Sequence, residues 1–294
     1  MSYGRAFALG VEEELLLVDP QTHLLAHDAR PVLSRVSGMK PDLYAALVES
    51  ASPISADATE AVGFLSEVRA QARAAGATLL GAGIHPAGPF GEAPHVDNER
   101  YREVGAQLRG LSHRTPTCAL HVHVGMPDAK TALRVFNGLR EHLPLLQALA
   151  TNSPFWHGHD SGLQSARAQM FRAYPRADIP QAFASWDEYE TSVAAVLEAG
   201  DLPDYTFLWW DLRPHPRLGT VEVRAMDAQS SLADVRGLAA LVQGLARRAA
   251  ETARPPWTAR EALVESSFRA ARDGLGATLW HEGTLRPSTR SCEP

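Results

Sequence analysis

Alternating apolar and polar residues predict three strands that carry charged side chains. The first occupies residues 10–19 and reads Gly-Val-Glu-Glu-Glu-Leu-Leu-Leu-Val-Asp, and the others occupy 117–126 and 219–227. Successive side chains of a strand point to opposite faces. Glu12 and Glu14 therefore share one face, with the acid between them on the other. Like charges side by side in a largely apolar strand repel each other and are costly to desolvate, so this face needs a cationic partner.

The rest of the chain shows helical spacing interrupted by short strands and turns. Helices are predicted over 29–36, 56–75, 98–111, 129–150 with a kink at Pro144, 162–172, 186–199, 231–254 and 258–272, and further strands over 47–49, 78–84 and 205–212. Strands and helices do not alternate strictly, which predicts an α+β fold with a mainly antiparallel sheet. A length of 294 residues fits one large domain or two small ones, and we expect one domain over 1–294.

Composition narrows the class of protein. Hydrophobic residues make up 45% and charged residues 21%, which is ordinary for a soluble enzyme, and the net charge of -6 argues against nucleic acid as a partner. No run reaches the roughly 18 apolar residues of a membrane span, and the N-terminus lacks a signal-peptide pattern. We therefore expect no membrane partner and a cytoplasmic location. Two cysteines make no disulfide framework or zinc cluster, and Cys118 is expected to be buried while Cys292 lies near the tail.

The acids of the first strand have two interpretations. Oxygen ligands at the spacing of Glu12 and Glu14 suit a hard cation such as Mg²⁺ or Mn²⁺, whereas an edge strand with one wet face would carry the same acids without a metal. His121 and His123 also share a strand face, which suits metal binding or phosphate contact, or else they are ordinary core or surface histidines. A His-x-His pair ends the first strand of amidohydrolase barrels, but here it falls in mid-chain without an eightfold βα pattern.

A second charged pair lies in the strand at 219–227, where Glu222 and Arg224 share a face. They could form a simple ion pair, which is worth little. Beside the first strand, however, Glu222 would add a carboxylate ligand and Arg224 a fixed cation able to grip a phosphoryl oxygen. The candidate ligands Glu12, Glu14, Glu49, Glu222 and His121 would suffice for two cations. No Gly-rich phosphate loop occurs, so metals and arginines would have to hold any nucleotide.

The chain resembles a known family through motifs that occur in the family's order. The motifs are GVEEELLLVD, the segment 42–49, GAGIHP, DNERY, HVHVG, SPFWHGHDSGLQSAR, WWDLRPHP, GTVEVRAMD and FRAARDGL, and they span residues 10 to about 275. They are similar to those of the YbdK-type carboxylate–amine ligases, also called type 2 glutamate–cysteine ligases. This resemblance implies a glutamine synthetase-like fold, in which a curved antiparallel sheet carries acids on its concave face and helices pack behind.

The resemblance also implies roles for particular residues. One metal would be held by Glu14, Asp42 and Glu49, and the other by Glu12, His121 and Glu222. Arg224 matches the arginine that binds the transferring phosphoryl group, so Arg224 and Glu222 are the catalytic candidates. Arg167, Arg213 and His123 are expected near phosphate or a substrate carboxylate.

The implied reaction is ATP-dependent and needs Mg²⁺ or Mn²⁺. It joins glutamate to an amine such as cysteine through an acyl phosphate, with small amino acids and ATP as partners and a homo-oligomer left open. The alternatives are a phosphotransferase of the guanidino-kinase type, a non-catalytic nucleotide-binding relative and a metal-dependent hydrolase. Family members usually continue beyond the FRAAR helix, so the C-terminal helical part is expected to be shortened. Ser266-Ser267-Phe268 replaces the family's Asn-Arg-Trp, so no substrate role is assigned there.

Overall fold

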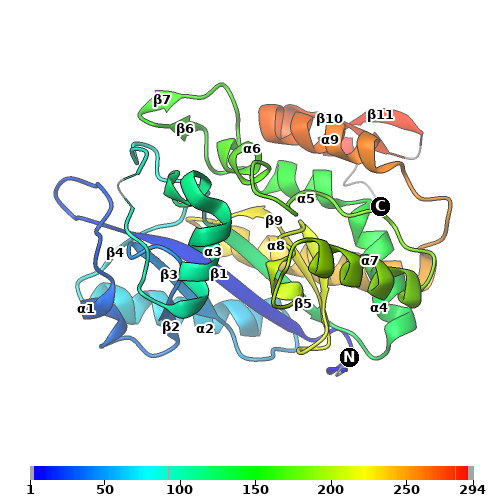
Figure 1. The fold of residues 1–294 in the computed structure, drawn as a ribbon, viewed down its shortest axis with the longest axis horizontal. Coiled ribbons are helices and arrows are strands. Elements are labelled where there is room, and N and C mark those ends of the chain that lie inside the picture. The colour runs from blue at the N-terminus through cyan, green and yellow to red at the C-terminus, as the bar shows by residue number, and fades with distance from the viewer. Residues whose placement is uncertain (1–2, 92, 282, 291–294) are drawn as a thin grey trace.

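A seven-stranded antiparallel sheet forms the centre of the protein. The computed structural model describes residues 3–91, 93–281 and 283–290. Its strands are β1 (Leu9–Val18), β2 (Met39–Pro41), β3 (Leu47–Ala51), β4 (Thr78–Leu80), β5 (Ala119–Gly125), β8 (Leu212–His215) and β9 (Thr220–Asp227). They follow the order β2-β3-β1-β5-β9-β8, and β4 pairs with the end of β1. The predicted α+β class with an antiparallel sheet is confirmed (Figure 1).

Helices surround this sheet, and some of them cover its apolar face. The helices are α1 (Arg30–Leu33), α2 (Ala58–Ala74), α3 (Glu99–Leu108), α4 (Ala129–Arg140), α5 (Leu143–Leu149), α6 (Ala166–Phe171), α7 (Trp186–Ala199), α8 (Leu232–Thr252) and α9 (Arg260–Asp273). Short 3₁₀ turns span Arg109–His113, Tyr205–Phe207, Gly274–Gly276 and Ser288–Arg290. α2, α4 and α8 pack against one another and against the sheet, where Val122, Val223 and Val242 are fully buried. This layer leaves the charged face of β1, β5 and β9 on the other side.

Local sequence signals fix where several helices begin. Ser231 accepts hydrogen bonds from the backbone N–H groups of Ala233 and Asp234 and so caps α8. Asp57 caps α2 in the same way. Pro144 does not kink one long helix: it lies in the first turn of α5, after α4 has ended at Arg140. Proline is well tolerated there because that N–H has no helical partner.

The predicted strand at 205–212 is wrong. Tyr205–Phe207 forms a 3₁₀ turn, and the strand is β8, which begins only at Leu212, the last residue of the predicted strand, and continues to His215. β8 lies at the edge of the sheet, where Pro214 interrupts no ladder on its outer side. The edge strand was missed because it contains Pro214. The aromatic residues before it are typical of strands and led to the wrong prediction over 205–212.

Two small hairpins were not predicted. β6 (Phe155–Trp156) pairs with β7 (His159–Asp160), and β10 (Thr278–His281) pairs with β11 (Thr284–Pro287) beside α9 (Figure 1). The expectation of a shortened C-terminal layer stays a prediction. Cys118 is buried as expected, whereas Cys292 lies outside the described residues. Within the described chain, no helix is long and apolar enough to cross a membrane.

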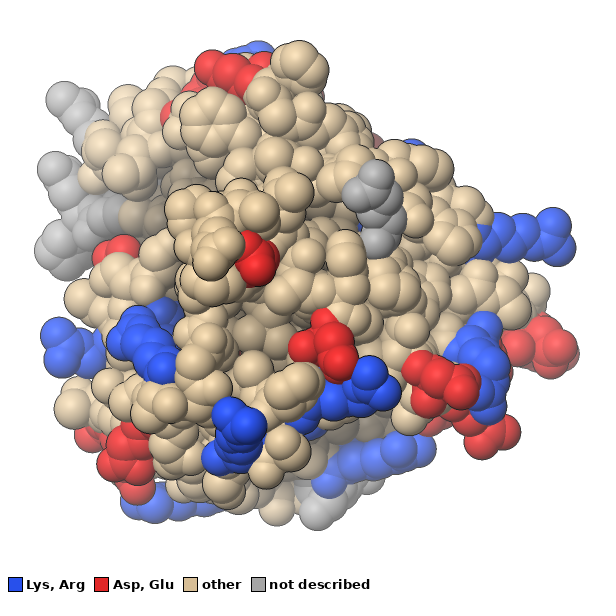
Figure 2. All heavy atoms as spheres, turned by 90° about the vertical axis from the view of Figure 1, so that its left-hand side faces the viewer, with Lys and Arg blue, Asp and Glu red and all other residues tan. Residues whose placement is uncertain are grey.

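One face of the molecular surface carries charges of both signs (Figure 2). On the face in Figure 2, basic and acidic side chains lie next to one another at several places. Lys40 and Arg30 each form an ion pair with a neighbouring acid, Glu49 and Asp28 respectively. Charges of both signs are interspersed on the face in Figure 2, and a concentration of acids lies in a cavity of the molecule instead.

Candidate active site

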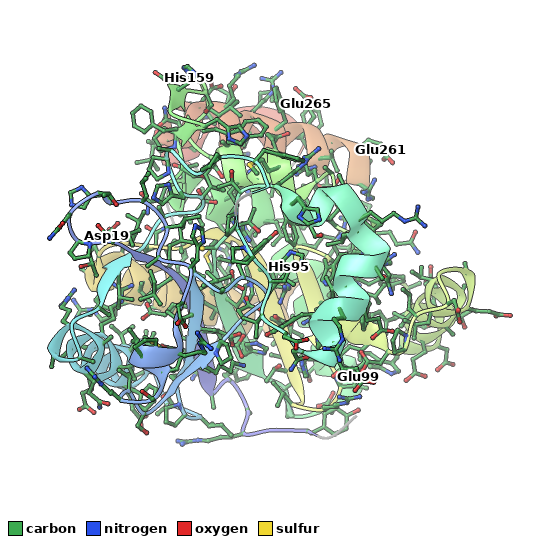
Figure 3. All side chains as sticks on the ribbon, turned by 60° about the vertical axis from the view of Figure 1, so that its left-hand side comes forward. Asp19, His95, Glu99, His159, Glu261 and Glu265 are labelled. Carbon is green, nitrogen blue, oxygen red and sulfur yellow. The ribbon has the colours of Figure 1, made fainter. Side chains whose placement is uncertain are left out.

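A cavity of about 440 Å³ opens on the charged face of the sheet, beneath α3. All ten candidate residues line it: Glu12, Glu14, Asp42, Glu49, His121, His123, Arg167, Arg213, Glu222 and Arg224. Figure 3 shows Glu99 at the start of α3, with His95 in the segment that leads to this helix. The fold thus brings into one cavity side chains that are spread over more than 200 residues of sequence.

The register of the sheet explains this convergence. Glu14 pairs with Glu49 between β1 and β3, and Glu12 pairs with His121 between β1 and β5. His123 then pairs with Glu222 between β5 and β9. Side chains of directly opposed residues lie on the same face of a sheet. Four neighbouring strands therefore present their polar side chains side by side.

Glu12, His123 and Glu222 form the tightest group of potential metal ligands. Each offers one ligand atom, and these atoms all lie within 4.8 Å of one another. His123 Nδ1 is 3.0 Å from the hydroxyl of Thr220. Its Nε2 lies 3.6 Å from Glu12 Oε1 and 3.7 Å from Glu222 Oε1, and it is buried without a hydrogen-bond partner in the described chain. A donor atom aimed between two carboxylates fits a bound cation.

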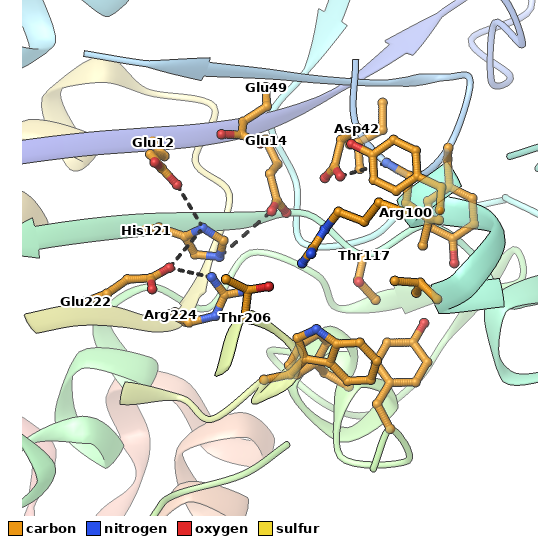
Figure 4. A pocket seen from close by; sticks show the side chains of 18 of the residues that line it. Glu12, Glu14, Asp42, Glu49, Arg100, Thr117, His121, Thr206, Glu222 and Arg224 are labelled. Carbon is orange, nitrogen blue, oxygen red and sulfur yellow. Dashed lines mark hydrogen bonds and ion pairs between the residues drawn. The ribbon is translucent and has the colours of Figure 1, made fainter. Parts of the chain in front are cut away.

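His121, the histidine that the sequence assigned to this group, lies between the two sets of acids. Its Nδ1 is 3.6 Å from Glu12 Oε2 and 4.0 Å from Glu222 Oε1, while its Nε2 is 3.8 Å from Glu14 Oε1 (Figure 4). Burial lowers the pKa of His121 to about 4, helped by the charge of Arg224. A neutral imidazole is the form that binds metals. Both histidines are therefore placed to contribute, and their division of labour stays a prediction.

Glu14, Asp42 and Glu49 form the second group of acids. Burial, reinforced by the charge of Asp42, raises the pKa of Glu14 to about 8. Burial and the charge of Glu12 raise the pKa of Glu49 to about 7, although Lys40 Nζ lies 2.9 Å from this carboxylate. These acids are thus short of positive charge. A cation bound among them would relieve that shortage.

The arginines of the cavity differ in how firmly they are held. Arg213 Nε donates to Glu222 Oε2 at 2.6 Å, and its Nη1 donates to the carbonyls of Thr206 and Leu208. Arg224 Nη1 donates to Glu222 Oε1, but its Nε is buried without a partner among the described residues. Burial opposes the charge of Glu222, yet Arg224 and Arg213 hold its pKa well below the usual range. Arg213 is therefore fastened to the protein, whereas Arg224 keeps a free donor.

Other lining residues escaped the sequence analysis. Lys40 comes from β2, and Arg100 and Tyr101 come from α3, with Arg100 Cζ 4.8 Å from the centroid of the Phe207 ring. Arg100 and Tyr101 belong to the DNERY motif, which gave no role because a helical surface position does not reveal its partner. Phe171, Tyr174 and Trp209 add an aromatic wall at the same end of the cavity.

The fold is similar to that of two solved ligase structures. A glutamate–cysteine ligase from Francisella tularensis, solved with AMP, superposes with a TM-score of 0.71 at 13% identity and covers 98% of this chain and 76% of its own. A bifunctional glutathione synthetase from Pasteurella multocida gives 0.70 at 15% identity, covering 91% of this chain and 42% of its own. At these identities the likeness shows that the fold is shared.

Sequence comparison then gives the family. The model of glutamate–cysteine ligase family 2 matches residues 8–290. A Rubrobacter xylanophilus relative is 40% identical over 286 residues, which is 93% of this chain and 77% of that protein. A protein of Natronomonas pharaonis named glutamate–cysteine ligase is 35% identical over 292 residues, or 95% and 81% of the two chains. The chain belongs to glutamate–cysteine ligase family 2, as its motifs predicted.

Proposed function

We propose that this enzyme joins a carboxylate of glutamate to the amino group of cysteine at the expense of ATP. The observation that carries this proposal is the convergence of ten acidic, imidazole and guanidinium side chains on one cavity. The Natronomonas relative, named glutamate–cysteine ligase, supports the choice of substrates. A cytoplasmic location and small-molecule partners follow from the use of ATP and free amino acids.

The same residues fit two divalent cations. Glu12, Glu222 and His123 or His121 would hold one ion, and Glu14, Asp42 and Glu49 the other, because their donors are the oxygen and imidazole ligands that Mg²⁺ or Mn²⁺ accepts. When bound, such ions neutralise the charge of nucleotide phosphates. The unpartnered Nε2 of His123 and the raised pKa of Glu14 support this fit.

The chain's own residues then act on the phosphoryl group and the substrates. The substrate carboxylate attacks the γ-phosphorus of ATP, which gives an acyl phosphate and ADP, and the amine displaces phosphate to form the amide. Arg224, anchored through Glu222, would stabilise the charge of the transferring group with its free donor. α3 and the segment that carries Arg167, Phe171 and Tyr174 border the cavity, and closing over it would protect the acyl phosphate from water.

Product analysis would distinguish the alternatives. A ligase releases ADP and free phosphate together only when both glutamate and an amine are present. A guanidino-kinase type of phosphotransferase would release ADP without phosphate, and a metal-dependent hydrolase would release phosphate without any amine. A non-catalytic relative would bind nucleotide without turnover. The family match does not favour these alternatives.

The experiment is a panel of amino acids assayed with ATP and Mg²⁺, with ADP, phosphate and peptide measured separately. We expect ADP, phosphate and γ-glutamyl peptide in equal amounts with glutamate and cysteine, and loss of all three in excess chelator. Turnover with another amine in place of cysteine would keep the ligase class but change the substrate. ADP formation without peptide for every pair would refute the proposal.

A further inference from the structure

Asp227 is a buried carboxylate that the proposed reaction does not use. It ends β9, the strand that also carries Glu222 and Arg224, and only 2% of its surface is exposed. It is not among the described residues that line the cavity. Its Oδ1 accepts a hydrogen bond from the hydroxyl of Ser165 at 2.9 Å. Its Oδ2 accepts from the hydroxyl of Ser153 at 2.7 Å and from the backbone N–H of Asn152 at 2.9 Å.

The two serines connect Asp227 to the start of α6. Ser165 Oγ caps the helix by accepting from the backbone N–H of Ala168 at 3.2 Å. Ser153 Oγ accepts from the backbone N–H of Arg167, also at 3.2 Å. Each hydroxyl thus donates to Asp227 and accepts from α6, and both serines are fully buried. One carboxylate therefore fixes the backbone on which the Arg167 side chain stands.

Arg167 needs such a support because its guanidinium is weakly held by direct contacts. Its Nη1 is 3.5 Å from the carbonyl of Ala225, and its Nη2 is 3.3 Å from the carbonyl of Arg224. Its Nε is buried without a partner in the described chain, and Nη1 lies 3.7 Å from Asp227 Oδ1. The side chain lines the cavity. A buried guanidinium with long bonds and one idle donor is suited to an anionic ligand.

The Asp227 carboxylate is tightly packed against Gly83. A Cβ atom at Gly83 would lie only 2.6 Å from Asp227 Cγ, so only glycine fits beside the carboxylate. The Gly83 N–H donates to the carbonyl of Asn152, which ties the same segment from the other side. The carboxylate is thus enclosed by the very segments that it joins. This packing makes it a rigid reference point rather than a mobile group.

We propose that Asp227 is a positioning residue that sets the place of Arg167 in the cavity wall by way of Ser153 and Ser165. The inference deepens the proposed function and rests on it, because Arg167 must bind an anionic group of ATP or of the amino-acid substrate. Asp227 does not line the cavity, so it would touch neither ATP nor the amino-acid substrate. Its effect on ligand binding should therefore require an intact Arg167.

A double-mutant cycle on ligand affinity tests this dependence. The affinities of a non-hydrolysable ATP analogue and of glutamate are measured by calorimetry, with Mg²⁺ present, for wild type, Arg167→Lys, Asp227→Asn and the double variant. Asn keeps the size of Asp but offers one acceptor oxygen instead of two, so an anchor of α6 is lost. We expect Asp227→Asn to weaken the ligand that Arg167→Lys weakens, by roughly tenfold. In the Arg167→Lys background the same change should cost less than about twofold.

Two further variants separate positioning from general stability. Ser153→Ala removes one link while Asp227 remains, and it should show the same dependence on Arg167 with a smaller loss of affinity, even if Asp227→Asn fails to fold. Glu13→Gln removes another buried carboxylate, which pairs with Arg69 away from the cavity, and it should lower the melting temperature without changing either affinity. The positioning role would be overturned if the affinity losses of Asp227→Asn and Arg167→Lys simply multiplied in the double variant. It would also be overturned if every variant lost affinity equally for the ATP analogue and for glutamate. If the wild type binds the ligands but makes no peptide, the proposed function fails while the cycle still decides the role of Asp227.

Discussion

The acids on the two faces of β1 differ in their partners. On the helix side, Glu13 receives two donors from Arg69, with Nη2 2.6 Å from Oε2, and Arg69 also donates to the carbonyls of Gln229 and Ser230. On the cavity side, Glu12 and Glu14 face other carboxylates and two histidines. Glu13 is thus paired with an arginine inside the protein, whereas on the other face Glu14 is left short of positive charge and its pKa is raised to about 8 by burial and the charge of Asp42.

This difference in pairing distinguishes an acid that stabilises the fold from acids that form a binding site. A buried ion pair with all donors satisfied ties α2 and the 229–230 segment to β1, and its loss leaves an uncompensated charge. Acids that crowd together with too few cations to balance them weaken the fold, and they persist where a ligand supplies the missing charge. The incomplete pairing of the cavity face is therefore the physical sign of a binding site. The complete pairing of Glu13 is the sign of a structural one.

The largest effect is expected at Arg224. This arginine is paired with Glu222 inside the protein, and its Nε has no hydrogen-bond partner in the described chain. Arg224→Lys retains the charge but not the planar fork, so turnover should fall by roughly two to four powers of ten. The melting temperature and the affinity for ATP should stay near those of wild type. Steady-state kinetics beside thermal melting measure this, and near-normal turnover would remove Arg224 from the mechanism.

Glu14→Gln should separate activity from stability. We expect turnover to fall about a hundredfold, because one preorganised charged group is lost. The melting temperature in chelator should rise or stay level, because the variant relieves repulsion with Asp42 and Glu49, the charges that raise the pKa of Glu14 together with burial. A clearly lower melting temperature in chelator would instead identify Glu14 as a structural acid.

Glu13→Gln should show the reverse pattern. The change leaves the Arg69 guanidinium buried without its anion, so the free energy of unfolding should drop by about 3 kcal/mol. Turnover of the folded fraction should match wild type, because Glu13 faces away from the cavity. Denaturant titration together with kinetics below the melting temperature checks both halves. Loss of turnover without loss of stability would erase the contrast between the faces.

The smallest effect concerns pH and metal. Glu14 and Glu49 have pKa values raised to about 8 and about 7 in the folded protein, so they bind more protons folded than unfolded. Stability without metal should therefore decline as pH rises from about 6.5 to 8. Below that window the decline is opposed by His121, because a histidine whose pKa is lowered by burial contributes stability that rises with pH. Melting curves should shift by a few degrees, and Mg²⁺ should abolish the decline; a decline unchanged by Mg²⁺ would contradict cation binding among these acids.

Much of this site could be inferred from the sequence by itself. Alternation in β1, β5 and β9 assigned Glu12 and Glu14, His121 and His123, and Glu222 and Arg224 to common faces, because the two-residue period of a strand is a local property. The family motifs then supplied the class of enzyme and the order of the parts. All ten candidates do line one cavity, although their individual roles stay predictions.

Only the tertiary structure decided which strands are neighbours and which side chains hold others in place. The register that sets His123 against Glu222, the fastening of Arg213 to Glu222, and the approach of Arg100 on α3 depend on contacts between distant segments. The strand at Leu212–His215 was missed because its alternation is short and contains a proline. Asp227 looked like an ordinary strand end in the sequence. Its role emerges from hydroxyls more than 60 residues away, which no local pattern can place.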